Sequence, residues 1–190
     1  MQDVGTPGDP LAARLRLERE ARGWSIGDLA ARSGVSRAMI SKIERNEASP
    51  TAVLLGRLSG AFGLTLSTLL ARSESDATGD GRVSRAACQV RWTDPETGYV
   101  RRAVSPPGAV PELVQVELPP GARIDYPKSA FTFLRGQCVW VLSGTLEFVE
   151  GALTRRLRRG DCLALGPPSD CSVVNPSAAT PCAYLVALTR

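Results

Sequence analysis

The stretch SIGDLAARSGVSRAMISKIERNEASP, residues 25–50, carries the clearest local pattern in this chain of 190 residues. Ser25 can cap a helix, and Asp28 three residues later completes a capping-box pattern. Gly34 and the residue after it suit a tight turn, and Ser36 can cap a second helix. Residues 25–50 therefore predict two short helices joined by a tight turn.

The second of these helices has two unlike faces. Met39, Ile40 and Ile43 recur at helical spacing and form its inner face. Its outward face is short or cationic, so it can approach DNA without steric or charge conflict. In helix-turn-helix geometry, the start of this helix enters the major groove. The DNA contacts that we predict are Ser36, Arg37, Ala38, Met39, Ser41, Lys42 and Arg45.

Three further helices are predicted around this pair. Asp9-Pro10 is an N-cap followed by proline at the first helical position, and Gly23 ends that helix. Ser49-Pro50 is expected to open a fourth helix, which ends near residue 62. Residues 65–70 form a short fifth helix. The helical domain therefore covers residues 10–70.

This half of the chain resembles the Cro/C1-type (XRE-like) helix-turn-helix family. The resemblance rests on the pattern RxxRGWSxxDLAxxSGVSRxxISKIERxExSPTxxxLxxLxxAFGLxLxxLL, which this sequence carries along its whole length. It implies a five-helix fold in which Ser36 starts the recognition helix. Many family members carry Gln where this chain has Ile26, so one familiar phosphate contact is absent. The alternative is a helical bundle whose arginines are merely solvated.

The sequence after this domain has a different character. Residues 71–87 are small and polar and are interpreted as a linker. From residue 88 onward, short alternating or β-branched runs are separated by Gly and Pro at about ten-residue spacing, which is typical of an all-β sandwich or barrel. The predicted strands are 88–92, 99–104, 112–118, 131–134, 138–142, 145–150, 153–159, 162–165, 171–174 and 183–188.

Residues 160–176, GDCLALGPPSDCSVVNP, resemble the second motif of the cupin family of small antiparallel β-barrels. Gly160 and Asn175 match the ends of that motif, and the position of its histidine falls on Cys171. In the first motif, Gly144 fits the closing glycine, which places Gln137 where a glutamate would stand. The resemblance covers about residues 112–188.

The residues that bind metal in cupins are the ones that differ here. The paired histidine positions fall on Phe131 and Phe133, which cannot ligate a metal, and Gln137 with Cys171 gives too few ligands. The resemblance therefore implies a pocket that binds a small ligand without a metal or other cofactor, through Phe131, Phe133, Gln137 and Cys171. Alternatively, Cys171 is a small core residue or a redox sensor, and Gln137 bonds a neighbouring strand.

Composition narrows the class of protein. The chain has no His, which excludes His-based catalysis and His-ligated metal. Its five Cys lack CxxC spacing, and neither a signal peptide nor a membrane span is evident, so we expect reduced thiols and a cytoplasmic, nucleoid-associated protein. Trp140 and Phe148 are predicted to be core residues. The basic run 155–159 is expected to be an exposed hairpin flank, with a second DNA-facing patch as the alternative.

Together these patterns predict a multidomain α plus all-β chain, with a five-helix Cro/C1-type domain followed by a cupin-like barrel over residues 88–190. The expected function is a dimeric, sequence-specific transcriptional regulator that binds operator DNA and a small-molecule effector, with no catalytic residue. The alternatives are a cupin-type metal-dependent enzyme fused to a DNA-binding domain, and an antitoxin-like module whose barrel is purely structural.

Overall fold

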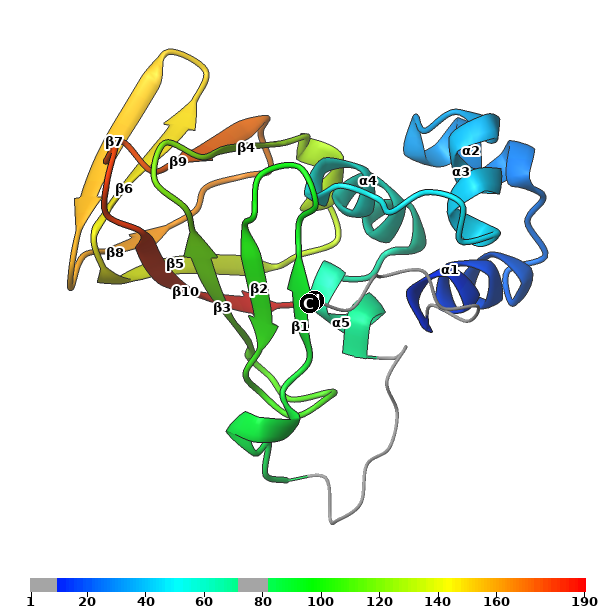
Figure 1. The fold of residues 1–190 in the computed structure, drawn as a ribbon, viewed down its shortest axis with the longest axis horizontal. Coiled ribbons are helices and arrows are strands. Elements are labelled where there is room, and N and C mark those ends of the chain that lie inside the picture. Colours follow the sequence, from blue (N-terminus) through cyan, green and yellow to red (C-terminus); the bar gives the residue numbers. More distant parts are fainter. Residues whose placement is uncertain (1–9, 72–81) are drawn as a thin grey trace.

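The computed structural model describes residues 10–71 and 82–190. Five helices form one domain, and two antiparallel sheets form the other (Figure 1). The predicted fold class, a five-helix domain followed by a cupin-like antiparallel barrel, is confirmed. Asp9, the expected first cap, and residues 72–81 of the proposed linker lie outside the described residues. In the described part of the chain, no helix is long and apolar enough to cross a membrane.

The helices begin and end where local signals place them, with one exception. Ser25 and Asp28 form the predicted capping box, and Ser36 caps the next helix by accepting a hydrogen bond from the Met39 backbone N–H. The fourth helix begins two residues later than predicted, because Thr51 caps it instead of Ser49. The helices are α1 (Pro10–Glu20), α2 (Ile26–Ser33), α3 (Arg37–Glu44), α4 (Ala52–Phe62) and α5 (Leu66–Ala71).

The barrel domain has two sheets. A six-stranded sheet has the order β1-β2-β3-β10-β5-β8, and a four-stranded sheet has the order β4-β9-β6-β7. The strands are β1 (Arg91–Thr93), β2 (Val100–Ala103), β3 (Glu112–Leu118), β4 (Arg123–Tyr126), β5 (Gly136–Ser143), β6 (Thr145–Glu150), β7 (Leu153–Arg158), β8 (Cys162–Ala164), β9 (Cys171–Val174) and β10 (Cys182–Thr189). Two short 3₁₀ helices are η1 (Ala86–Cys88) and η2 (Lys128–Ala130).

Two strand assignments from the sequence were wrong. The predicted strand 131–134 is a turn after η2, closed by a hydrogen bond from the Leu134 N–H to the Phe131 carbonyl. The apolar pattern of this segment fills a cavity instead of a sheet face. Strand β4 was missed because its four residues include Arg123 and Asp125, which turn outward and pair with each other.

The barrel core lies between the two sheets. It includes Val114, Val116, Leu146 and Phe148, none more than 2% exposed. Phe148 is therefore a core residue, as predicted. Trp140 is not, because its side chain is 47% exposed on the outer face of β5, where its Nε1 donates to the Gly160 carbonyl.

Asn175, which closes the second cupin-like motif, has a structural role. Its side chain is wholly buried, and Nδ2 donates to the carbonyls of Leu118, Pro119 and Thr180 at 2.9–3.1 Å. One amide thus ties the end of β3 to the loop before β10. Conserving hydrogen bonds for buried carbonyls in this way avoids a large desolvation cost.

The two domains pack directly against each other. Gly60 of α4 approaches η2 so closely that a Cβ there would lie 2.6 Å from the Ser129 carbonyl oxygen. Nearby, the hydroxyls of Thr65 and Thr68 donate to the Glu112 carboxylate on β3, at 2.6 and 3.0 Å. Any movement of α4 and α5 relative to the barrel must therefore rearrange these contacts.

Candidate nucleic-acid interface and ligand cavity

The outward face of α3 presents polar and basic side chains to solvent. Arg37, Ala38 and Lys42 are exposed, and Ser41 is half-buried. Ser36 uses an oxygen lone pair to cap α3, with the Met39 N–H at 3.2 Å, so its hydroxyl hydrogen stays available to donate. Donors at the start of a helix, where the helix dipole is positive, suit a phosphate.

Two of the three predicted cations on this face are free to meet an anion. Within residues 10–71 and 82–190, neither Arg37 nor Lys42 forms an ion pair with an acid. Arg45 is different, because it holds the Glu47 carboxylate at 2.6 and 2.8 Å and donates to the Ser41 hydroxyl at 2.6 Å. A phosphate at Arg45 would have to compete with Glu47.

Met39 does not share the outward orientation of its neighbours. It is half-buried and packs against the helical core with Ile26, the residue that stands where relatives carry Gln. The predicted DNA set is thus brought together on one face except for Met39, which the structure places at the inner edge of that face. Its DNA contact stays a prediction.

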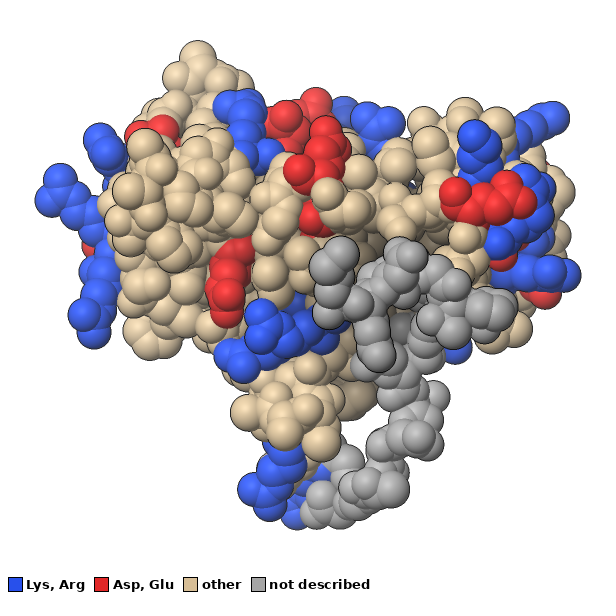
Figure 2. Space-filling model, in the orientation of Figure 1, with Lys and Arg blue, Asp and Glu red and all other residues tan. Residues whose placement is uncertain are grey.

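Basic side chains gather at two ends of the molecule. Figure 2 shows one group at the end that carries α1–α3 and another at the opposite end, over the β6–β7 hairpin. In the second group, Arg158 and Arg159 are exposed, as expected for a hairpin flank. The two groups lie too far apart to act as one surface.

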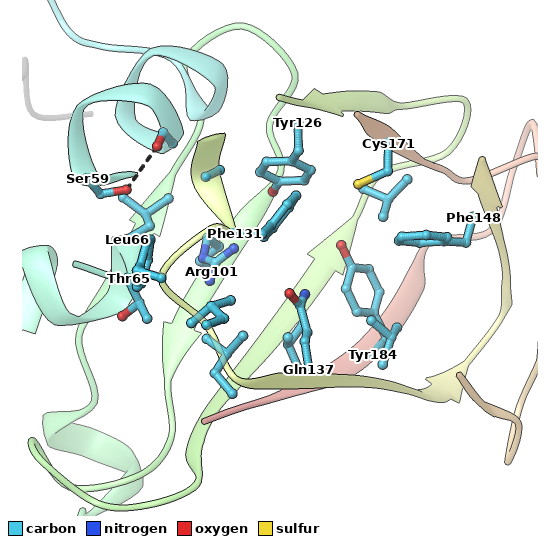
Figure 3. A pocket seen from close by; sticks show the side chains of 18 residues that line it. Ser59, Thr65, Leu66, Arg101, Tyr126, Phe131, Gln137, Phe148, Cys171 and Tyr184 are labelled. Carbon is cyan, nitrogen blue, oxygen red and sulfur yellow. Dashed lines mark hydrogen bonds between the residues drawn. The ribbon is translucent and has the colours of Figure 1, made fainter. Parts of the chain in front are cut away.

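A cavity of about 60 Å³ lies at the helical end of the barrel. All four predicted ligand-binding residues line it: Phe131 and Phe133 from the turn after η2, Gln137 from β5 and Cys171 from β9. Figure 3 shows the Gln137 amide and the Cys171 sulfur pointing toward its middle. The structure thus brings these residues together, and their binding of a ligand stays a prediction.

A wider hollow of about 400 Å³ lies beside this cavity. The two share four lining residues: Phe131, Leu134, Gln137 and Cys171. Those side chains form the wall between the inner cavity and the hollow. A ligand that enters from that side must pass them.

Sequence reasoning missed the other polar residues of the cavity. Arg101 and Tyr184 line it from β2 and β10, and Ser59 with Thr65 reach it from the helical domain. Alternation along residues 99–104 could have revealed Arg101, because it lies two residues after the buried Tyr99 and so shares its inward face. No pattern in the sequence indicates that α4 and α5 complete the lining.

The lining does not fit the metal site of the cupin family. Two of its positions hold phenylalanine, and the remaining amide and thiol cannot complete a ligand set. Among the described residues, no group of three or more His, Cys, Asp or Glu side chains could hold a metal ion. We therefore derive no metal chemistry for this barrel.

The thiol of Cys171 is poorly suited to redox sensing. Burial, with smaller effects of Glu150 and Asp170, raises its pKa to about 12, and burial raises the pKa of Cys182 to about 11. Because the thiolate is the reactive form, both thiols are inert near neutral pH. Cys88, in contrast, is exposed.

Alkylation should separate these cysteines. At pH 8 we expect iodoacetamide to modify Cys88 and to leave Cys171 and Cys182 unmodified in the folded protein, as followed by peptide mass spectrometry. Denatured protein, in which all five thiols should react, is the control. Modification of Cys171 as fast as Cys88 would contradict this assignment and favour a redox role.

Comparison with known proteins identifies the helical half. Residues 15–69 match the helix-turn-helix family model. Residues 15–69 form a helix-turn-helix domain. The chain is 40% identical over 65 residues to the HTH-type transcriptional regulator SutR of Escherichia coli, and the match covers 34% of this chain and 36% of SutR. It is 32% identical over 69 residues to SinR of Bacillus licheniformis, covering 36% of this chain and 60% of SinR.

The likeness beyond the helix-turn-helix domain is one of fold. A crystal structure of an HTH_3 family transcriptional regulator from Vibrio cholerae superimposes with a TM-score of 0.76 over 95% of both chains, at 18% identity. The arrangement of helix-turn-helix domain and barrel is therefore a shared one. The curated relatives match only the helix-turn-helix domain, about a third of SutR, so they do not extend to the cavity.

Proposed function

We propose that this protein is a sequence-specific, DNA-binding transcriptional regulator in which α3 is the recognition helix. The observation that carries the proposal is the exposed start of α3, where Arg37 and Lys42 form no ion pair within the described residues of a helix-turn-helix domain. Base edges are read from Ala38, Ser41 and Lys42, while Ser36 and Arg37 hold the phosphate backbone. Its place would be the cytoplasm, on the chromosome.

We further propose that the barrel senses a small molecule and carries no catalytic residue. The lining of the cavity supports this role, because it combines side chains from the barrel with Ser59 and Thr65 of the helix-turn-helix domain. A ligand there contacts both domains, so it can favour one interdomain arrangement over another. That difference in affinity is what shifts DNA binding.

Two copies of the chain are expected to act together. One recognition helix of eight residues reaches few base pairs, so a two-fold pair doubles the contacts and reads an inverted repeat. We assign the pairing to the barrel domain. The half-sites should then lie about one helical turn, or 10 base pairs, apart or at a multiple of it.

Selection of bound duplexes from a random DNA library tests this proposal. The full chain should enrich an inverted repeat with that half-site spacing, and mapping of bound sites in cells should return the same sequence. An isolated half-site in every selected duplex would overturn the dimeric reading. Recovery of duplexes with no common sequence would overturn specific recognition and leave an architectural role.

A further inference from the structure

The cavity between the domains contains a positive charge. Arg101 on β2 and Tyr184 on β10 both pair in register with Val116 of the intervening strand β3, so they lie in one row on the inner face of the sheet. Arg101 lines the cavity, and its Nε is inaccessible to solvent. Arginine stays protonated in proteins, so this charge is permanent.

A chain of hydroxyls extends from the guanidinium. Nη1 of Arg101 donates to the Tyr99 hydroxyl at 3.0 Å, and that hydroxyl lies 2.8 Å from the hydroxyl of Tyr126. Because Tyr99 accepts from Arg101, its own hydrogen points to Tyr126. The hydrogen of Tyr126, which lines the cavity, is then available to a ligand.

The hydroxyl of Tyr184 adds a second neutral donor. Tyr184 is only 2% exposed, and within residues 10–71 and 82–190 its hydroxyl has no hydrogen-bond partner. Figure 3 shows it pointing into the cavity, with the Gln137 amide beside it. Burial raises the pKa of Tyr126 and Tyr184 well above the usual value, so both phenols stay protonated as donors. A buried donor left without an acceptor is costly, which indicates that a ligand or water completes it.

The rest of the cavity limits the size and shape of that ligand. Among the described residues, no Asp or Glu lines it, and the remaining wall includes Phe148, Val186 and Leu188. The volume of about 60 Å³ holds roughly four or five water-sized groups. The space therefore suits a compact molecule with an acidic head and a short apolar tail.

We propose that the cavity is a binding site for a short-chain carboxylate, whose head lies against Arg101 and the tyrosine hydroxyls and whose tail packs toward Phe148. Charge-assisted bonds to a guanidinium are stronger than neutral ones, and the planar fork of arginine matches a carboxylate. Ser59 and Thr65 lie at the same cavity, so the anion also contacts the helix-turn-helix domain. Its role as the effector rests on the function proposed above.

Calorimetric titration of the full chain tests the site without DNA. The probes are acetate, propionate and butyrate, each beside its neutral amide of the same shape. We expect at least one carboxylate to bind about tenfold or more tightly than its amide. Equal binding of acid and amide would overturn the proposal, as would binding of none of the acids.

Three variants locate the binding. Arg101→Gln should weaken carboxylate binding about tenfold or more and leave amide binding unchanged, while Tyr184→Phe, which keeps the ring, should weaken it severalfold. The control is Arg102→Gln, because this next residue faces outward and donates to Gln115. If Arg101→Gln fails to fold, Tyr184→Phe decides alone, and unchanged binding in it overturns the site.

A separate measurement distinguishes this site from the proposed function. Operator affinity is compared with and without the carboxylate that binds. Carboxylate binding with no change in operator affinity would keep the site and overturn its role as effector. Absence of any operator binding would overturn the proposed function alone.

Discussion

Replacing Arg37 and Lys42 together with alanine is expected to weaken operator binding by about 3 kcal/mol, on the order of a hundredfold. Both side chains are exposed on α3 and form no ion pair in the described part of the chain, so each is available to a phosphate or a base. Fluorescence anisotropy of a labelled operator gives the affinity at several salt concentrations. Each cation that neutralises a phosphate adds about 0.9 to the slope of log K against log salt, and the variant should lose that share.

The matched control removes two positive charges elsewhere. Arg158 and Arg159 are exposed at the opposite end of the molecule, on the β7 hairpin, so their double alanine variant changes the net charge equally. It should bind the operator with nearly native affinity. If this control were as defective as the α3 variant, the hairpin would be a second DNA-facing patch. If neither variant lost affinity, α3 would not be the recognition helix.

The helical domain was largely predictable because its signals are local. Ser25 with Asp28, Ser36 and Gly34 each act within a few residues, through caps and one left-handed turn, and the structure places all of them as expected. The two-residue error at α4 has the same origin. Ser49 and Thr51 are both capping residues, and the sequence alone does not decide between them.

The cavity was predictable only in part because its lining is non-local. Gln137 and Cys171 were found through a resemblance of spacing, and Phe131 lines the cavity although its segment is a turn and not a strand. Arg101 was overlooked because an arginine pair in an alternating run reads as solvated. The contribution of Thr65 depends on how the two domains pack, which the close approach at Gly60 permits and no local pattern encodes.

Replacing Glu44 with glutamine is expected to destabilise the helix-turn-helix domain by about 3 kcal/mol. Glu44 is the one acid of α3, yet it points inward. Its carboxylate accepts from Nε and Nη2 of Arg19 at 2.7 and 2.8 Å, and the two side chains are only 7% and 11% exposed. Removing one partner of a buried pair leaves the other charge uncompensated. The same pair joins α1 to the end of α3, so it also fixes the angle of the recognition helix.

Chemical denaturation of the full chain, followed by helical circular dichroism, measures this loss. Glu20→Gln is the control, because Glu20 pairs with Arg16 on the surface of α1 and also lies near Arg19, but is 46% exposed. It should leave the unfolding midpoint essentially unchanged, since exposed pairs contribute little. Equal midpoints for the two variants would mean that Arg19 finds a substitute partner, with its bond to the Trp24 carbonyl sufficient to hold it. A lower midpoint for Glu44→Gln alone would place the stability of the recognition helix in this one inward-facing acid.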